Sequence, residues 1–167
     1  MKRIIIVLTL CLALLAACAV AETTGTKTLQ LGTSAYTIEI PESFVEGEVT
    51  EEDMTDDMVA YMQSPETELD FDIYQFNKEG YPETIAEFVA EEADEYEAVE
   101  VVTDGEINGI AAAWYRAVEN FDGQEYNTLT YVLEDGDDYV EIAFWLDGDT
   151  AEEEAKAIMD TLSFVTR

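Results

Sequence analysis

Alternating apolar and polar residues predict an antiparallel sheet along most of this chain. The pattern is clearest over residues 36–40, where apolar side chains at 36, 38 and 40 alternate with Thr37 and Glu39, the period of a half-buried strand. Further strands are predicted over residues 29–31, 58–63, 68–76, 99–103, 110–120, 126–133 and 139–146. Turn sequences at 108–109, 122–123 and 134–137 separate the last four strands and favour consecutive hairpins.

Two segments instead follow the period of an amphipathic helix. Pro82-Glu83 opens the first, which runs to residue 96 and places five apolar residues on one stripe. These are Ile85, Phe88, Val89, Ala93 and Tyr96. The second helix begins with Asp149 or Thr150 as its N-cap and has a glutamate three residues later, as in a capping box. Its apolar stripe consists of Ala155, Ile158, Met159 and Leu162.

The order of these elements is strands, a helix, an antiparallel meander and a closing helix. No linker rich in Pro, Gly or Ser divides the chain, and no internal repeat is visible. The sequence therefore predicts a single α+β domain over residues 29–167, in which two helices pack on an antiparallel, meander-rich sheet.

The first 21 residues have the composition of a secretory signal peptide. A basic start precedes an apolar run over residues 4–15 and a segment of small residues. Cutting after Ala21 would release a soluble protein, which is the alternative we favour; cutting before Cys18, at the end of a sequence like a lipobox, would leave a lipidated cysteine at the cell surface. A retained membrane anchor is the third alternative, although the apolar run is short for a span. Residues 22–28 then form a short tether.

Both cysteines, Cys11 and Cys18, fall in this leader. The domain that follows is therefore expected to fold without a disulfide, although export normally permits disulfides. Its stability must come from a packed core, which a chain with 48% apolar and 11% aromatic residues can supply.

The domain is strongly acidic. The chain has 39 Asp and Glu against 7 Lys and Arg, and Lys2 and Arg3 lie in the leader, which leaves a net charge of −34 after residue 21. Such a charge repels nucleic acid and anionic membrane surfaces, so a lipid anchor would be its only link to a membrane. The chain has no histidine, which excludes Ser-His-Asp and Cys-His nucleophile systems and imidazole metal ligands.

The order of elements resembles the superfamily that includes the PsbP proteins of photosystem II and the Mog-type Ran-binding proteins. The resembling parts are the early hairpin with YTIEIPESF at 36–44, the middle helix at 84–96, the start of the meander with EINGI at 106–110, and the end of the closing helix with IMDTLSF at 158–164. The resemblance spans residues 26–166 and contains no catalytic motif. It implies an antiparallel sheet with helices packed on it, and it assigns no functional residue.

Acidic turns are the first candidate for a functional site, because Ca²⁺ takes about six to eight oxygen ligands. The candidates lie in two turns, with Asp135, Asp137 and Asp138 in one and Asp147 and Asp149 in the other. A weak site would form if the two turns met at one end of the sheet. The alternative is that these Asp and Gly residues serve only as turn formers.

A pair of carboxylates is the second candidate. Asp70 and Asp72 share one face of a predicted strand, and two carboxyl groups in one cleft could act as general acid and base in a hydrolase. The alternative for this pair is a solvated face of the sheet.

A row of glutamates along the first helix is the third candidate. Glu83, Glu87, Glu91 and Glu95 follow one another at i, i+4 spacing. Each like-charge pair costs about 0.2–0.5 kcal/mol, so the row is either a binding face for a cationic partner or a solvated face that favours solubility.

Aromatic residues of the meander could form a platform on which a ligand stacks. The set comprises Trp114, Tyr115, Tyr131, Tyr139 and Trp145. The alternative is packing in the core or across strands. Arg116 lies among many acids and is expected to form a salt bridge, and Glu152 and Lys156 have the spacing of a favourable helical pair.

The leader, the charge and the missing catalytic motif favour an exported, non-catalytic binding or accessory domain. Its partner would be a cationic protein, peptide or cell-envelope component, and no cofactor or catalytic residue is expected. The alternatives are a Ca²⁺-responsive binding domain and a secreted carboxylate-dependent hydrolase. The first interpretation requires the acids to disperse over a packed body, whereas the hydrolase requires several of them to converge in a pocket.

Overall fold

The computed structural model describes residues 25–49, 55, 57–67, 69–121, 124–148 and 150–165, with the backbone alone at 120, 121 and 124. The leader with Cys18 and Ala21, most of the tether and the candidate ligand Asp149 lie outside the described residues. Within the described ranges, no helix is both long and apolar enough to cross a membrane.

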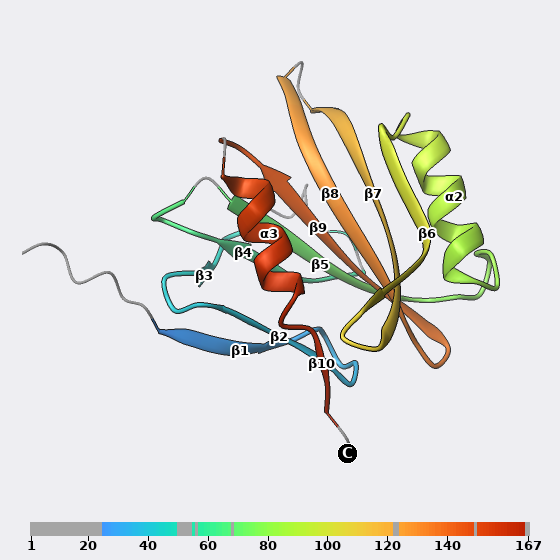
Figure 1. Ribbon diagram of the computed structural model, residues 1–167, viewed down its shortest axis with the longest axis horizontal. Coiled ribbons are helices and arrows are strands. Elements are labelled where there is room, and N and C mark those ends of the chain that lie inside the picture. The colour runs from blue at the N-terminus through green and yellow to red at the C-terminus, as the bar shows by residue number, and fades with distance from the viewer. Residues whose placement is uncertain are drawn as a thin grey trace, which may run out of the picture.

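A seven-stranded antiparallel sheet forms the body of the domain, in the order β3-β4-β5-β9-β8-β7-β6 (Figure 1). Its strands are β3 (Val45–Glu46), β4 (Met58–Gln63), β5 (Leu69–Asn77), β6 (Glu100–Ile107), β7 (Ile110–Phe121), β8 (Gln124–Asp135) and β9 (Asp138–Leu146). Consecutive strands from β6 to β9 pair as the predicted hairpins. Asn108 and Gly109 both have positive φ, 53° and 82°, as a type I′ hairpin turn requires.

A small sheet of three strands lies beside the large one. It contains β1 (Thr26–Gln30), β2 (Tyr36–Pro41) and β10 (Ser163–Phe164), in the order β1-β2-β10. The tether predicted over residues 22–28 is wrong at its end, because Thr26 already pairs with Pro41. The strand predicted at 29–31 therefore begins earlier than expected, because residues 26–28 are polar and partly exposed and show no apolar alternation.

Two helices pack on the large sheet, α2 (Ile85–Glu95) and α3 (Ala151–Met159). The first begins two residues later than the predicted Pro82-Glu83, because the hydroxyl of Thr84 accepts a hydrogen bond from the Glu87 backbone N–H and makes Thr84 the N-cap. At α3 the N-cap is Thr150, whose side chain makes no capping hydrogen bond. The predicted α+β fold with two helices on a meander-rich antiparallel sheet is confirmed.

The two faces of the large sheet are covered unequally. One face packs against α3 and the small sheet and carries the main core; in Figure 1, α3 lies in front of this face. On the other face, α2 contacts β6, β7 and β8 and buries Phe88 and Val89 against the sheet. Because α2 covers only part of this second face, side chains of β5 and β9 remain partly accessible there.

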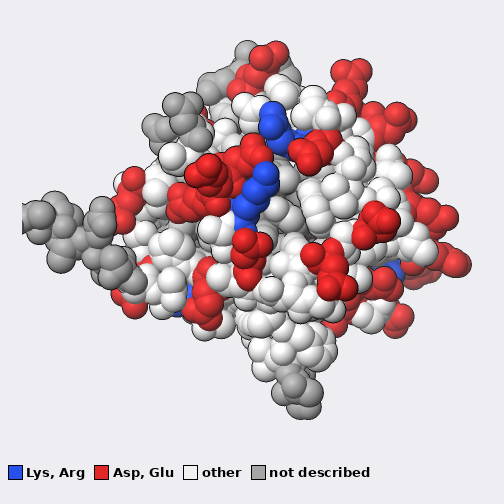
Figure 2. Space-filling view, viewed as in Figure 1, with Lys and Arg blue, Asp and Glu red and all other residues white. Residues whose placement is uncertain are grey.

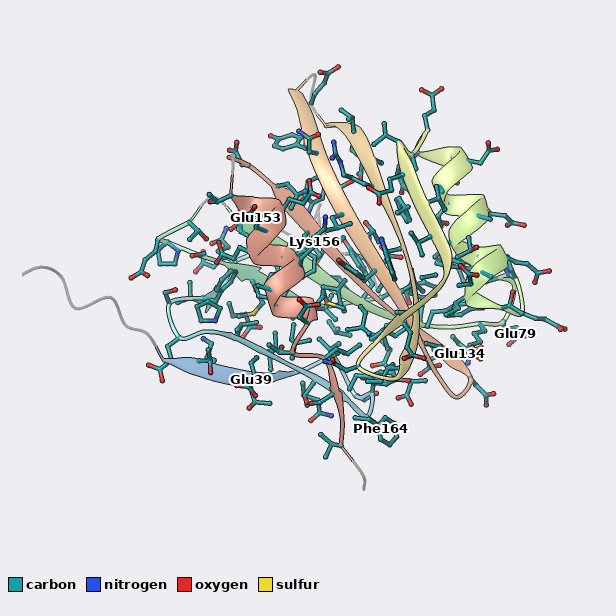
Figure 3. The ribbon with its side chains drawn as sticks, in the orientation of Figure 1. Glu39, Glu79, Glu134, Glu153, Lys156 and Phe164 are labelled. Carbon is teal, nitrogen blue, oxygen red and sulfur yellow. The ribbon has the colours of Figure 1, made fainter. Side chains whose placement is uncertain are left out.

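Phe71 is at the centre of the main core. Its ring lies between those of Phe44 and Phe144, with centroid distances of 5.5 and 5.1 Å. All three side chains are fully buried. In contrast, Phe164 at the end of β10 projects away from the core and is 56% exposed (Figure 3).

Acidic side chains are distributed over the face seen in Figure 2, where the few basic side chains lie next to acids. Arg116 pairs with Glu152 at 3.4 Å, and Lys156 pairs with the same carboxylate at 2.6 Å. The salt bridge expected for Arg116 and the helical pair expected for Glu152 and Lys156 are therefore confirmed.

Candidate functional site: an acid–aromatic groove

A groove of about 350 Å³ lies on the face of the large sheet that α2 partly covers. Its described lining consists of Thr55, Asp57, Tyr74, Phe76, Tyr81, Phe88, Glu92, Tyr96, Tyr115, Glu119, Thr130, Glu141, Ala143 and Trp145. Four of these residues are acids, seven are aromatic and none is basic. We call this feature the acid–aromatic groove.

Strands β5 and β9 supply much of the floor. The predicted alternation in β9 places Val140, Ile142 and Phe144 in the main core, so Glu141 and Trp145 must point to the opposite face. The register between β5 and β9 then places Tyr74 of β5 directly opposite Glu141. An acid and two large rings are thus held on neighbouring strands by backbone pairing.

The C-terminal end of α2 forms one wall. Glu92 is half-buried there, and the ring of Tyr96, the residue that caps the helix, stacks on Tyr115 of β7 with a centroid distance of 6.0 Å and an angle of 10°. Tyr115 is only 2% exposed. The stack therefore joins the C-terminal end of the helix to the sheet at the groove.

A buried carboxyl group, that of Asp72, holds one ring of the groove in place. Asp72 is 6% exposed and accepts a 2.6 Å hydrogen bond from the indole Nε1 of Trp145. Burial raises the pKa of Asp72, while the hydrogen bond from Trp145 lowers it. This hydrogen bond fixes the orientation of the Trp145 ring, which lines the groove.

Glu141 is the acid most affected by its surroundings. Burial is the largest of the causes that raise its pKa from 4.5 to about 8. The carboxylates of Glu92, Glu119 and Asp72 add to the shift, because like charges disfavour ionisation. Glu141 is therefore largely protonated at neutral pH when the groove contains no cation.

The pKa values of other groups in the groove are raised by the same negative charges. Burial raises the pKa of Glu92, and the carboxylates of Glu95, Glu91 and Glu119 raise it further. The hydroxyl of Tyr96 has its pKa raised from 10.0 to about 12, first by burial and then by Glu92. A site of this kind attracts positive charge and repels anions, and its ring faces can contact a cation directly.

Comparison with solved structures finds this architecture in proteins of low sequence identity. Cyanobacterial PsbP (CyanoP) from Synechocystis sp. PCC 6803 matches with a TM-score of 0.59 at 8% identity, over 89% of this chain and 97% of CyanoP. The Ran-binding protein Mog1p of Saccharomyces cerevisiae matches with a TM-score of 0.51 at 12% identity, over 84% of this chain and 96% of Mog1p. This chain has a PsbP/Mog1-like fold. The resemblance inferred from the order of elements is therefore confirmed.

A third structure is longer than this chain. It comes from Bacteroides thetaiotaomicron VPI-5482 and matches with a TM-score of 0.54 at 17% identity, over 82% of this chain and 50% of the other. The chain thus spans half the length of that protein. No protein-family model and no curated protein matches the sequence.

Sequence reasoning missed three of the residues that matter most in this PsbP/Mog1-like domain: Glu92, Glu119 and Glu141. A signal for Glu141 was present, because Tyr139, Ala143 and Trp145 share its face of the strand, and apolar neighbours on the polar face of a strand indicate that this face is covered. Glu92 lies beside the exposed row of Glu87, Glu91 and Glu95, and only the packing of α2 shows that it faces the groove. The expectation that the acids disperse is wrong for this group.

The two carboxylates of the predicted pair on β5, Asp70 and Asp72, differ in how deeply they are buried. Asp70 and Asp72 share the groove face, but Asp72 is buried beneath Trp145, whereas Asp70 is half-buried and accepts a 3.1 Å hydrogen bond from the hydroxyl of Tyr61. The interpretation of this pair as a solvated face is therefore wrong for Asp72, because the neighbouring rings cover it.

The candidate Ca²⁺ turns are not brought together. Asp135 pairs with Asp138 at one end of β9, and Asp147 follows Leu146 at the other end. Figure 3 shows the same separation, with Glu134 at the tip of the β8–β9 hairpin and Glu153 at the start of α3. Among the residues that the structure describes, no group of three or more Asp, Glu, Cys or His side chains is arranged to hold a metal ion.

The aspartates of the β8–β9 turn form hydrogen bonds with other parts of the chain. The backbone N–H of Ala35 donates to Asp135 at 3.1 Å, and the amide of Gln75 donates to Asp138 at 3.0 Å. Asp137 is exposed, and its backbone oxygen accepts a hydrogen bond from Asn77. These hydrogen bonds tie the turn to β2 and β5, which is a structural role.

The five aromatic residues considered as one platform lie on two faces of the sheet. Trp114 and Tyr131 form a cross-strand pair on the α3 side, with ring centroids 5.7 Å apart. Tyr115, Tyr139 and Trp145 lie on the α2 side. Only Tyr115 and Trp145 line the groove, because the side chains of successive residues in a strand point to opposite faces.

Proposed function

We propose that this protein is an exported, non-catalytic binding domain that recognises a cationic partner through the acid–aromatic groove. The observation that carries the proposal is the convergence of Asp57, Glu92, Glu119 and Glu141 on one groove whose described lining has no basic residue. Convergent acids in a concave site concentrate negative potential and favour the binding of positive charge. The leader at residues 1–21 supports export.

A role in binding also agrees with the comparisons. One protein of the same fold, Mog1p, is named for binding Ran. A fold hosts many functions, so the argument for a cationic partner comes from the side chains of the groove. The partner classes that fit are a basic protein, a lysine-rich peptide and a cationic component of the cell envelope.

The second candidate is a carboxylate-dependent hydrolase. The observation that favours it is the raised pKa of Glu141, about 8, which suits a general acid at neutral pH. The negative field of the groove would also stabilise the positive charge that develops at a sugar carbon during glycoside hydrolysis. Turnover of a soluble oligosaccharide that Glu141→Gln abolishes would favour this candidate over binding.

The proposal predicts binding that depends on the location of the removed charges. The test compares E119Q/E141Q with E91Q/E95Q, which removes two charges from the exposed row on α2. A lysine-rich peptide is expected to bind the first variant at least about a hundredfold more weakly than the wild type, because each of the two lost charge-assisted hydrogen bonds costs about 1.5–3 kcal/mol. The second variant should lose roughly twofold.

The measurement is fluorescence anisotropy of the labelled peptide at low and high salt, with an uncharged peptide of equal length as the control. Binding should weaken as salt rises, because counterions screen the exposed part of the interaction. Equal losses in the two variants would contradict the proposal, since they would mean that the peptide responds to net charge and not to the groove.

A further inference from the structure

We propose that the groove binds an aliphatic chain that carries two or more ammonium groups. This inference rests on the proposed function and names the chemical class of its ligand. The ligand chemistry is shared by free polyamines and by peptides with closely spaced lysines, and the experiment below separates these two sources.

The spacing of the acids argues for several separate positive charges. Asp57, Glu92, Glu119 and Glu141 enter the groove from four different segments: the residues before β4, helix α2, strand β7 and strand β9. They surround a space of about 350 Å³ and do not meet around one point, since no described group of acids is arranged to hold a metal ion. Ammonium groups joined by flexible spacers can reach acids placed in this way.

The rings of the groove argue for aliphatic spacers. Tyr74, Tyr96, Tyr115 and Trp145 line the same groove as Glu92 and Glu141. Ring faces pack against methylene groups and also attract an adjacent ammonium group through cation–π interaction. The orientation of these rings is fixed in advance by the stack of Tyr96 on Tyr115 and by the hydrogen bond from Trp145 to Asp72, so a ligand would not have to order them.

The Glu141 carboxyl group is the polar group of the groove that a ligand would satisfy. It is half-buried in the groove, and no hydrogen bond to it is found among the described residues. Because a polar group that loses water without gaining a partner is costly, a hydrogen-bond donor that the described part of the chain does not supply would stabilise this carboxyl group.

Binding of the ligand is coupled to a proton. An ammonium group beside Glu141 favours its ionised form, so the carboxyl group must release its proton as the ligand enters. The titratable groups that face Glu141 are Asp72 and Tyr74 of β5, Glu119 and Tyr115 of β7, Glu92 of α2, and Tyr96 at the end of that helix. All of them are acids or phenols, so none can donate a compensating positive charge.

Isothermal titration calorimetry of the purified protein tests the inference, with spermidine as the polyamine and n-butylamine as a ligand with one ammonium group. Spermidine should bind one molecule per groove, at least about tenfold more tightly than n-butylamine, and at least about tenfold less tightly to Glu141→Gln. E91Q/E95Q is the matched control and should change the affinity about twofold. Titrations in phosphate and in Tris should differ in heat, because a proton is released. The affinity should rise by more than about tenfold from pH 6 to pH 8.

The outcomes separate this inference from the function on which it rests. Spermidine binding that is equal in wild type and Glu141→Gln, while a lysine-rich peptide still requires the groove, would overturn the polyammonium inference and leave the proposed function standing. Loss of groove dependence for both ligands would overturn both. Binding of spermidine without the peptide would identify a free polyamine as the source, and binding of both would identify the shared chemistry.

Discussion

Replacement of Glu141 by glutamine is expected to raise the free energy of unfolding at pH 9 by about 5 kcal/mol and to leave it almost unchanged at pH 4. The pKa of Glu141 is about 8 in the folded chain against an ordinary value of 4.5. Between pH 4.5 and about pH 8 the folded state holds a proton on Glu141 that the unfolded state has released. The wild type therefore loses stability as the pH rises through this window, whereas the uncharged amide does not.

The measurement is thermal unfolding of both proteins from pH 4 to pH 9 at constant ionic strength. A difference of about 5 kcal/mol corresponds to roughly 15 °C in Tm for a domain of this size. Glu95→Gln, on the exposed side of α2, is the control and should shift the free energy by less than about 0.5 kcal/mol at every pH. Parallel curves for wild type and Glu141→Gln over the whole range would mean that Glu141 titrates like a solvated carboxyl group.

Replacement of Phe71 by alanine is expected to cost about 3–5 kcal/mol of stability. The ring is fully buried between Phe44 and Phe144, and the rigid sheet on which it lies cannot close the cavity that remains. The domain is expected to have no disulfide to compensate, so a loss of this size is a large fraction of its total stability.

Phe164→Ala is the matched substitution for this prediction. Phe164 is 56% exposed and makes an edge contact with Tyr36 at 5.7 Å, so its loss should cost about 1 kcal/mol or less. Urea unfolding of the two variants measures the difference. Similar losses in both would contradict the placement of Phe71 at the centre of the core.

The sequence was informative wherever one face of an element is buried and the other is wet. Alternation in the strand at 139–146 predicted that Val140, Ile142 and Phe144 share a core face, and all three are fully buried. The Asn108-Gly109 turn predicted a hairpin because few residue pairs tolerate positive φ at both positions. Local rules of this kind depend on residues close together in the chain, and they gave the strand order of the meander.

The same reasoning failed where tertiary packing decides. The first residues of β1, 26–28, are polar and have no apolar partner positions, so they resembled a tether. The groove could not be predicted for a different reason. Glu92, Glu119 and Glu141 lie far apart in the sequence, and their convergence depends on the register of four strands and on the position of α2. In a chain with 39 acids, composition alone cannot select the few that meet.

The distribution of the aromatic residues over two faces follows from the alternation of side chains along a strand. Trp114 and Tyr115 are adjacent in sequence, so they had to point to opposite faces of the sheet. The register confirms this, with Trp114 against Tyr131 and Tyr115 against Thr130. The same rule divides the predicted platform and places Tyr115 and Trp145 on the face that carries Glu141.

The most direct test of a cation-binding groove is the titration of the Glu141 carboxyl group by carbon-detected NMR, with and without saturating spermidine. The free protein should show a pKa near 8 for this group. Spermidine should lower that pKa by more than about one unit, because an adjacent ammonium group favours the carboxylate. A titration curve for Glu141 that spermidine leaves unchanged would contradict the account.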